Sequence, residues 1–298
     1  MSPPRLRLIR MPYVGERNAP DRSPAPAEID DAALAALLAN GGAMMSPSAE
    51  AALTSSEDRQ YGAWQRVALA NAHLGRIVEA SLRDGDLPIG LLANCNALPG
   101  MLAGVQRAND GGGAPGDVGL IWIDAHADFN TPETTLSGML GGMPVALCAG
   151  LCLHRLRGIA GMTGPIAAAH ILMCGLRDVD PLERALLDEH CVAEIGTAAL
   201  IAAGPELTEA VEALAVGVDA IYVHVDMDVL DPAEVPGHPL TVPGGPTSEQ
   251  LAMSLAAIFR CTTVAALGIA STPPADRDSD GRARRAAHRL IAAAVGAR

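Results

Sequence analysis

The sequence predicts one domain over residues 1–298, an α/β fold with three α/β/α layers around a mainly parallel sheet. Short runs of aliphatic and β-branched residues alternate with longer stretches rich in Ala and Leu, as strands and helices do in such folds. The short runs are apolar at nearly every position, which is typical of strands buried on both faces of a parallel sheet. No internal repeat and no clear linker divides the chain.

The elements follow from the apolar pattern. Six buried strands are expected, at Arg5–Ile9, Leu87–Cys95, Val118–Ile123, His170–Gly175, Ala220–Val225 and Val264–Ile269. Six principal helices are expected, at Ile29–Leu38, Gln60–Arg83, Pro181–Glu189, Glu206–Val216, Ser248–Arg260 and Arg282–Val295. Ligands of parallel sheets bind beyond the carboxyl ends of the strands, so the polar residues that follow strands are the candidates for a site.

Three shorter segments lie between these elements. Glu16–Glu28 is rich in Pro and charged residues and is expected to be a mobile surface loop, and Asn109–Gly116 is expected to be a Gly-rich turn. Val145–Leu153 is expected to be a helix that places Cys148 and Cys152 on one face. We interpret both cysteines as small packing residues, the usual role of free cysteine in a core.

Composition excludes several classes of function. The net charge of −13 and the pI of about 4.9 argue against a nucleic-acid partner, because phosphate binding needs a basic surface. The sequence has no run of about 18 apolar, uncharged residues that would predict a membrane span. The six cysteines are irregularly spaced, which indicates reduced thiols and a cytoplasmic protein. The expected partner is therefore a small molecule.

A polar cluster follows the expected strand Val118–Ile123. Asp124, His126 and Asp128 recur at every second position, which places their side chains on one side of an extended segment. Two carboxylates and an imidazole on one side suit a divalent metal of the manganese or zinc type. The alternative is a strand end with solvated acids and a hydrogen-bonded histidine.

A second acidic cluster follows the expected strand Ala220–Val225. Asp226 and Asp228 share a face, and two unpaired carboxylates there would repel each other unless a cation lay between them. Two such motifs at the ends of parallel strands favour one shared metal centre. Asp231 precedes a proline and is expected to be a turn residue, and His224 lies deeper in the strand without an assigned role.

These motifs resemble those of the ureohydrolase family, which comprises the arginases, agmatinases and formiminoglutamases. Asp124–Pro144 (DAHADFNTPETTLSGMLGGMP) resembles the first signature of the family, and His224–Pro232 (HVDMDVLDP) resembles the second. Cys174–Pro181 (CGLRDVDP) resembles a third segment that is strongest in arginases. The order and approximate spacing also fit, and the likeness extends from about Leu87 to the C-terminus.

The resemblance implies a centre of two divalent metal ions, both manganese. Asp124 and Asp226 would bridge the two ions, with Asp128 on one side and His126 and Asp228 on the other. The two cations would lower the pKa of a shared water that attacks the substrate carbon. Asp128 would then pass a proton to the departing amine.

The resemblance also implies a substrate site. Asn130 and Ser137 match positions that hold the substrate's amino-acid end, and Asp180 matches the residue that receives its α-ammonium group. The alternative is that all three serve turns and helix caps, for which these residue types are suited. Family resemblance further implies a homo-oligomer, a trimer or a hexamer.

Cys95 is the first departure from the family pattern. The family carries a Gly-Gly-Asp-His segment whose histidine completes the first metal site, and the matching segment Leu92–Asn96 (LANCN) places Cys95 at the histidine's position. A thiolate is a softer ligand that favours zinc or iron more than histidine does. The alternative is a small buried cysteine that ends a strand. A cysteine at this position also resembles the hydroxyarginine-hydrolysing branch of the family.

Two further departures concern the substrate. Gly141 stands where arginases have a histidine that shuttles protons, and Ser271 stands near the position of a glutamate that pairs with the guanidinium. A serine cannot offer the bidentate carboxylate that a guanidinium prefers. His238 is a candidate to replace the missing histidine, although the sequence favours a surface-loop residue.

The function expected from these motifs is hydrolysis of a linear C–N bond by a binuclear, metal-dependent amidinohydrolase. The expected substrate is arginine-like or N-hydroxyarginine-like. One alternative is a hydrolase of formimino compounds, and another is a catalytically silent relative that binds a metal or ligand. A deacetylase-type hydrolase would need a site with one metal held by His and Asp, and the Asp-rich pair of motifs argues against it.

Overall fold

The computed structural model describes residues 4–16, 19–60, 62–109 and 117–298. Within these ranges nine strands form one sheet in the order β2-β1-β4-β9-β8-β5-β6-β7, with β3 paired to β1. Every strand pair in it is parallel. The strands are β1 (Arg5–Met11), β2 (Met44–Met45), β3 (Ala49–Glu50), β4 (Leu87–Leu92), β5 (Val118–Ile123), β6 (Ile171–Cys174), β7 (Ala193–Ile195), β8 (Ala220–Asp226) and β9 (Val264–Ala270).

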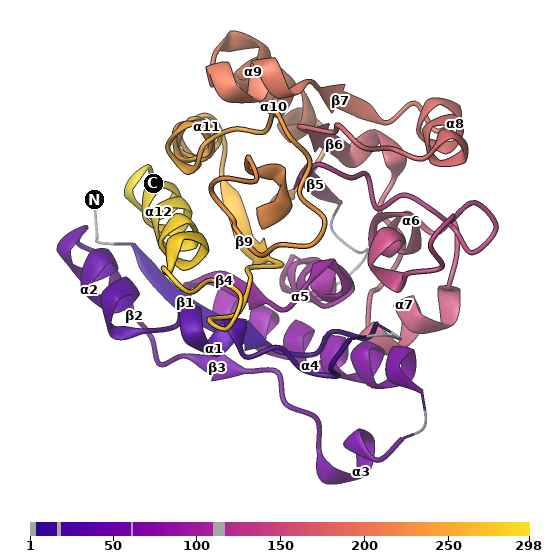
Figure 1. Ribbon diagram of the computed structural model, residues 1–298. Helices are drawn as coiled ribbons and strands as arrows, with labels where there is room; N and C mark the ends of the chain where they lie inside the picture. Colours follow the sequence, from indigo (N-terminus) through magenta and orange to yellow (C-terminus); the bar gives the residue numbers. More distant parts are fainter. Residues whose placement is uncertain (1–3, 17–18, 61, 110–116) are drawn as a thin grey trace.

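Helices cover both faces of the sheet, which confirms the predicted three-layer α/β/α architecture. Figure 1 shows α2, α11 and α12 over one face and α4, α5 and α7 over the other. The helices are α1 (Ala25–Ile29), α2 (Ala32–Asn40), α3 (Ser55–Asp58), α4 (Ala63–Arg83), α5 (Leu98–Ala108), α6 (Pro144–Ala149), α7 (His154–Ala160), α8 (Pro181–Glu189), α9 (Thr197–Ala202), α10 (Pro205–Val216), α11 (Ser248–Cys261) and α12 (Arg282–Gly296). None of these described helices has the length and apolar character needed to cross a membrane.

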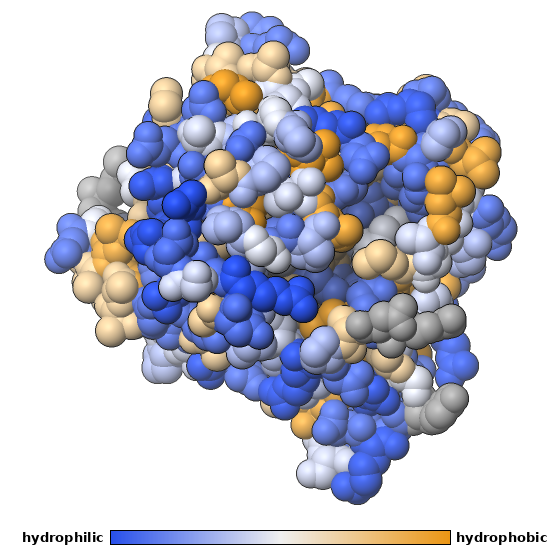
Figure 2. All heavy atoms as spheres, in the orientation of Figure 1, coloured by the Kyte–Doolittle hydropathy of each residue, from blue (hydrophilic) through white to orange (hydrophobic). Residues whose placement is uncertain are grey.

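Two hydrophobic cores lie on the two faces of the sheet. Successive side chains of β5 alternate between them: Ile121 and Ile123 belong to the core under α10, α11 and α12, whereas Leu120 and Trp122 belong to the core under α4 and α5. This alternation follows from the period of two along a strand, and burial on both sides explains why the strand is apolar throughout. The outer face drawn in Figure 2 is mainly hydrophilic, with apolar residues in small scattered groups.

The sequence did not predict α5, which contains a proline and two glycines. Both glycines lie against α4, where a Cβ on Gly100 would stand 2.6 Å from Asn71 Oδ1 and one on Gly104 would stand 2.4 Å from Val78 Cβ. Glycine usually weakens a helix, but here it lets two helix backbones approach closely. The same residues that indicate a loop therefore belong to a helix–helix contact that only the folded chain reveals.

Several predicted boundaries are wrong by a few residues. The strand expected to reach Cys95 ends at Leu92, because Asn94 accepts the Asn96 backbone N–H at 3.2 Å and Cys95–Ala97 form a 3-10 turn, η1. The helix expected over Ile29–Leu38 is divided into α1 and α2. The other shifts are of the same kind: α4 begins at Ala63 rather than Gln60, α10 begins at Pro205, β6 is shorter by one residue at each end, and α6 ends at Ala149.

The loop predictions have mixed outcomes. Residues 110–116 of the expected Gly-rich turn and residues 17–18 of the expected loop Glu16–Glu28 lie outside the described ranges. The end of the latter segment enters α1. The described part before it is tied to the fold, since Tyr13 and Arg22 form an antiparallel bridge and the Val14 N–H donates to Asp21 O at 3.0 Å.

Candidate metal centre

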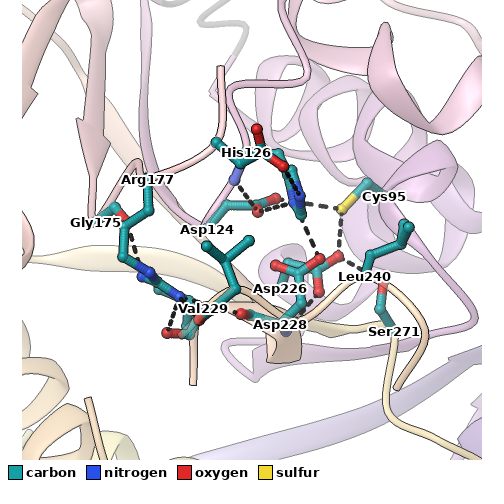
Figure 3. Close-up of polar contacts among 12 residues, drawn as sticks. Cys95, Asp124, His126, Gly175, Arg177, Asp226, Asp228, Val229, Leu240 and Ser271 are labelled. Atoms are coloured by element: carbon teal, nitrogen blue, oxygen red, sulfur yellow. Dashed lines mark hydrogen bonds and ion pairs between the residues drawn. The ribbon is translucent and has the colours of Figure 1, made fainter. Parts of the chain in front are cut away.

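The two acidic motifs meet at the carboxyl ends of four neighbouring strands. Cys95 follows β4, Asp124 follows β5, Asp226 is the last residue of β8, and Ser271 follows β9. These four strands are adjacent in the order β4-β9-β8-β5. Figure 3 shows their side chains pointing toward one another above the strand ends. The position agrees with the general placement of ligand sites in parallel α/β sheets.

One group of potential metal ligands combines a thiol with two carboxylates. Ligand atoms of Cys95, Asp124 and Asp226 all lie within 4.8 Å of one another. Cys95 Sγ is 2.8 Å from Asp226 Oδ2 and 3.9 Å from Asp124 Oδ2. All three residues are buried, so the surrounding protein shields the group from bulk solvent.

A second group shares Asp124 with the first. Ligand atoms of Asp124, His126 and Asp228 also lie within 4.8 Å of one another. His126 Nδ1 stands 3.1 Å from Asp228 Oδ2 and 3.4 Å from Asp124 Oδ1. The backbone N–H of His126 donates to Asp124 Oδ1 at 2.7 Å, and this bond holds the shared carboxylate between the two groups.

The charges of the centre demand compensation. Burial and the neighbouring Asp228 carboxylate raise the pKa of Asp226 from 3.8 to about 6. Burial, together with the charges of Asp228 and Asp226, raises the pKa of Asp124 well above its ordinary value. Burial lowers the pKa of His126, but hydrogen bonds to Asp124 and Asp228 outweigh it and raise that pKa to about 12. Carboxylates crowded in this way are the environment in which a divalent cation is the natural counter-charge.

Asp128, which the resemblance implies is a further metal ligand, faces the same cavity as these groups. It lines the same cavity but is absent from the described clusters of three potential ligands within 4.8 Å. Its backbone adopts φ +48°, a left-handed conformation that is uncommon for a residue other than glycine. Its carbonyl oxygen accepts the N–H of Val145 at 3.0 Å, at the start of α6. This contact turns the chain sharply after the metal motif and keeps the Asp128 side chain beside the cavity.

The three predicted substrate-binding residues line a cavity of about 580 Å³ in front of the centre. Asn130 is buried and donates from Nδ2 to Asp180 Oδ2 at 3.2 Å, so these two residues form one polar patch. Asp180 precedes α8 and also serves its start, because its N–H donates to Glu183 Oε2 at 3.2 Å. Ser137 is exposed, and its Oγ accepts the Met139 N–H at 3.2 Å. Asp180 and Ser137 therefore do form turn and helix-start contacts, as the alternative expected, and they still line the cavity.

Comparison with known proteins identifies the family. A sequence model described as "Arginase family" matches residues 6–296. The chain belongs to the arginase family. The arginase of Brevibacillus brevis is 30% identical over 200 residues, an alignment that covers 64% of this chain and 62% of that protein. The chain thus matches less than two thirds of that relative's length.

Solved structures of the arginase family share the fold. The arginase of Bacillus subtilis subsp. subtilis str. 168 superposes with a TM-score of 0.84 at 23% identity, covering 98% of both chains. The formimidoylglutamase of the same strain superposes with a TM-score of 0.76 at 19% identity, covering 100% of this chain and 88% of the other. The resemblance noted in the metal motifs therefore extends to the architecture of nearly the whole chain.

Cys95, at the position where the arginase-family pattern has histidine, is backed by a buried aromatic stack. His224 Nε2 lies 3.4 Å from Cys95 Sγ, and His224 Nδ1 lies 2.8 Å from the hydroxyl of Tyr222. The His224 ring stacks on Trp122 with centroids 4.2 Å apart. Burial lowers the pKa of His224 to about 3, so the ring is neutral. Sequence analysis assigned no role to His224, although it lies two residues before Asp226 and so shares its face of the strand.

Ser271 also acts on the centre rather than on the cavity alone. Its Oγ donates to Asp226 Oδ2, and its backbone adopts φ +62°. A strained backbone at a functional position indicates that surrounding contacts impose the conformation. Ser271, near which the resemblance implies a glutamate, thus holds one of the expected bridging carboxylates by a hydrogen bond.

The interpretation of His238 as a surface-loop histidine is wrong. Its side chain is only 6% exposed, and its Nε2 lies 3.9 Å from Asp226 Oδ1. Ligand atoms of His238, Asp226 and Asp228 form a third group within 4.8 Å. Because the loop after η4 (Met227–Val229) folds back over the strand ends, a residue ten positions beyond Asp228 reaches the centre, and spacing along the sequence could not show this.

Proposed function

We propose that this chain is a binuclear, metal-dependent amidinohydrolase that cleaves a linear C–N bond of an amidine or guanidine. The observation that carries the proposal is the pair of ligand groups that share Asp124. One shared carboxylate between two groups supports two adjacent ions rather than one. Membership of the arginase family supports the same reaction class.

The donor set suits two divalent cations. Asp228 Oδ1 is buried and has no hydrogen-bond partner among the described residues, an arrangement that is costly unless a cation satisfies it. Most donors are carboxylate oxygens, which favour manganese, with His126 as a nitrogen donor. Cys95 adds one softer donor on the β4 side, which widens the range of acceptable metals toward zinc or iron. When bound, the ions would acidify a water and polarise the substrate.

The remaining residues then have separable tasks. Asp128 lines the cavity outside the three groups, where its carboxylate can take a proton and deliver it to the departing amine. The Asn130–Asp180 patch offers an acceptor for an α-ammonium group and a donor for an α-carboxylate. His238 Nδ1 accepts the Leu240 N–H at 3.2 Å, which leaves Nε2 facing Asp226 and the cavity.

The substrate that we favour is an amino acid with an N-hydroxyguanidine or guanidine head. The Asn130–Asp180 patch supports the amino-acid end. On the β9 side of the cavity Ser271 offers a hydroxyl and no carboxylate, so from that side the less basic N-hydroxyguanidine is easier to accommodate than a plain guanidinium. A formimino compound meets the same requirement and is the alternative within this class.

The test is hydrolysis by purified chain loaded with manganese. L-arginine, N-hydroxy-L-arginine, agmatine and N-formimino-L-glutamate are supplied separately, and urea, hydroxyurea and formamide are measured. We expect product from at least one substrate, and no product after chelation or in Asp124→Asn. Absence of all three products with two bound metals per chain would contradict the proposal and support the silent metal-binding relative, which Gly141 and Ser271 favour.

A further inference from the structure

Described residues of the N-terminal segment 14–24 form one wall of the cavity, and they include an acid that lies outside the metal motifs. Val14, Glu16, Arg22 and Pro24 line the cavity together with Cys95 and Asp128. The segment is anchored at both ends, because Asn94 Nδ2 donates to Val14 O at 2.9 Å and the Ser23 N–H donates to Pro12 O at 2.8 Å. Its place at the cavity is therefore built into the fold.

The Glu16 carboxylate is held by three N–H donors. Its Oε1 accepts the Gly141 N–H at 2.5 Å and Asn96 Nδ2 at 3.1 Å, and its Oε2 accepts the Leu140 N–H at 3.3 Å. The same Asn96 amide donates to Val14 O at 2.7 Å, which couples the carboxylate to the backbone beside it. A carboxylate held in this way has a fixed position and a directional set of free lone pairs.

Gly141 explains how the carboxylate fits. A Cβ at residue 141 would stand 3.1 Å from Glu16 Oε1, closer than nearly all such contacts, and a larger side chain would have to displace the carboxylate. The absence of a side chain at residue 141 is thus what leaves room for the Glu16 carboxylate. The position where the family pattern has a basic, proton-carrying ring is filled by an acid from another part of the chain.

The contacts favour charge recognition over proton transfer. A carboxylate that accepts from three N–H groups is held as a hydrogen-bond acceptor, and its remaining lone pairs can accept from another donor. Arg22, the basic residue among the described residues of this segment, is paired with Glu50 at 2.9 Å and lies over the Tyr13 ring. Within the described part of the chain, the Glu16 carboxylate forms no ion pair with an arginine or histidine, and it lines the cavity.

We propose that Glu16 is the residue that selects a positively charged head group on the substrate. Ser271 cannot do this by charge, because its side chain is uncharged. The proposal rests on the proposed amidine or guanidine substrate. Glu16 would accept hydrogen bonds from an amidinium or guanidinium, while Gly141 leaves the room it needs. Specificity would then depend on the N-terminal segment rather than on the loop after β9.

The test compares binding of L-lysine and L-norleucine to manganese-loaded protein by calorimetry. Their apolar stems are similar, only lysine ends in a cation, and neither has an amidine carbon, so neither is hydrolysed. We expect wild type to prefer lysine. Glu16→Gln should reduce this preference about 10- to 100-fold and leave norleucine binding unchanged, because charged hydrogen bonds are the stronger ones. Glu133→Gln, an exposed acid on the nearby loop that does not line the cavity, is the matched control and should change neither affinity.

Three results would overturn the proposal. They are no preference for lysine in wild type, an equal loss of both ligands in a folded Glu16→Gln, and an unchanged preference in that variant. Gly141→Ala should weaken lysine binding in wild type and add nothing in Glu16→Gln, and additive effects would count against the coupling. Thermal unfolding shows whether each variant is folded. Binding is measured without turnover. A failure to hydrolyse any amidine would therefore contradict the proposed function without deciding whether Glu16 selects a cation.

Discussion

Removing metal from this centre should make stability fall as pH rises. In the folded chain the pKa of Asp226 is raised from 3.8 to about 6, whereas the unfolded chain has the ordinary value. Below pH 3.8 both states bind the proton. Between 3.8 and 6 only the folded state does, so the stabilisation is lost as pH rises through 6. A shift of about two pKa units corresponds to about 3 kcal/mol.

The other groups set the limits of this window. Asp124 and Asp128 also have raised pKa values, because of burial, and act in the same direction. Burial raises the pKa of Asp228, but hydrogen bonding to His126 outweighs burial and lowers it. The stabilisation of the folded state by Asp228 is therefore complete above pH 3.8 and is lost only at lower pH. His126, with its pKa near 12, retains its contribution below 6.5 and loses it gradually toward 12. The decline between pH 4 and 7 therefore comes from the raised carboxyl groups.

The assay is calorimetric unfolding of chelator-treated protein from pH 4 to 7. At about 2 °C per kcal/mol for a chain of this size, the Tm should fall by about 6 °C or more. Asp226→Asn should flatten the slope. With excess manganese the Tm should instead rise with pH, because metal binding requires deprotonated ligands. A metal-free Tm that stays constant or rises across this window would refute the electrostatic account of the centre.

Three further predictions follow from single contacts. Cys95→His should abolish the near-ultraviolet sulfur-to-metal absorption of the cobalt-loaded protein while retaining two bound ions; the same band in both proteins would exclude a thiolate ligand. Gly268→Ala places a Cβ 2.1 Å from the Tyr222 hydroxyl and should lower the free energy of unfolding in urea by about 1–3 kcal/mol, and an unchanged value would contradict the packing. Asn130→Ala removes the amide that donates to Asp180. It should raise KM for an amino-acid substrate about tenfold with little change in kcat, and a loss in kcat alone would assign Asn130 another role.

The sheet and the carboxylate pairs could be predicted from the sequence because both depend on local periodicity. Apolar runs such as Val118–Ile123 are buried on both faces, and the period of two then places Asp124 and His126 beyond the strand end. The short edge strands β2 and β7 were not predicted, since two or three residues carry no periodic signal.

The groups that complete the cavity could not be predicted in the same way. Glu16 comes from a Pro-rich segment 125 residues before Gly141, and His238 comes from a loop that folds back over the strand ends. Neither position follows from spacing, because each depends on how distant segments pack. Gly141 did signal a departure, but only its contact with Glu16 shows what takes the place of a side chain.

In the proposed centre, two metal ions are bound and Cys95 is a ligand of one of them. The most direct test is anomalous scattering from crystals of the metal-loaded chain, collected at the metal absorption edge. We expect two ions, one on either side of Asp124, with Cys95 Sγ about 2.3–2.5 Å from one of them. A single ion, or two ions with the Cys95 sulfur beyond about 3 Å from both, would contradict it.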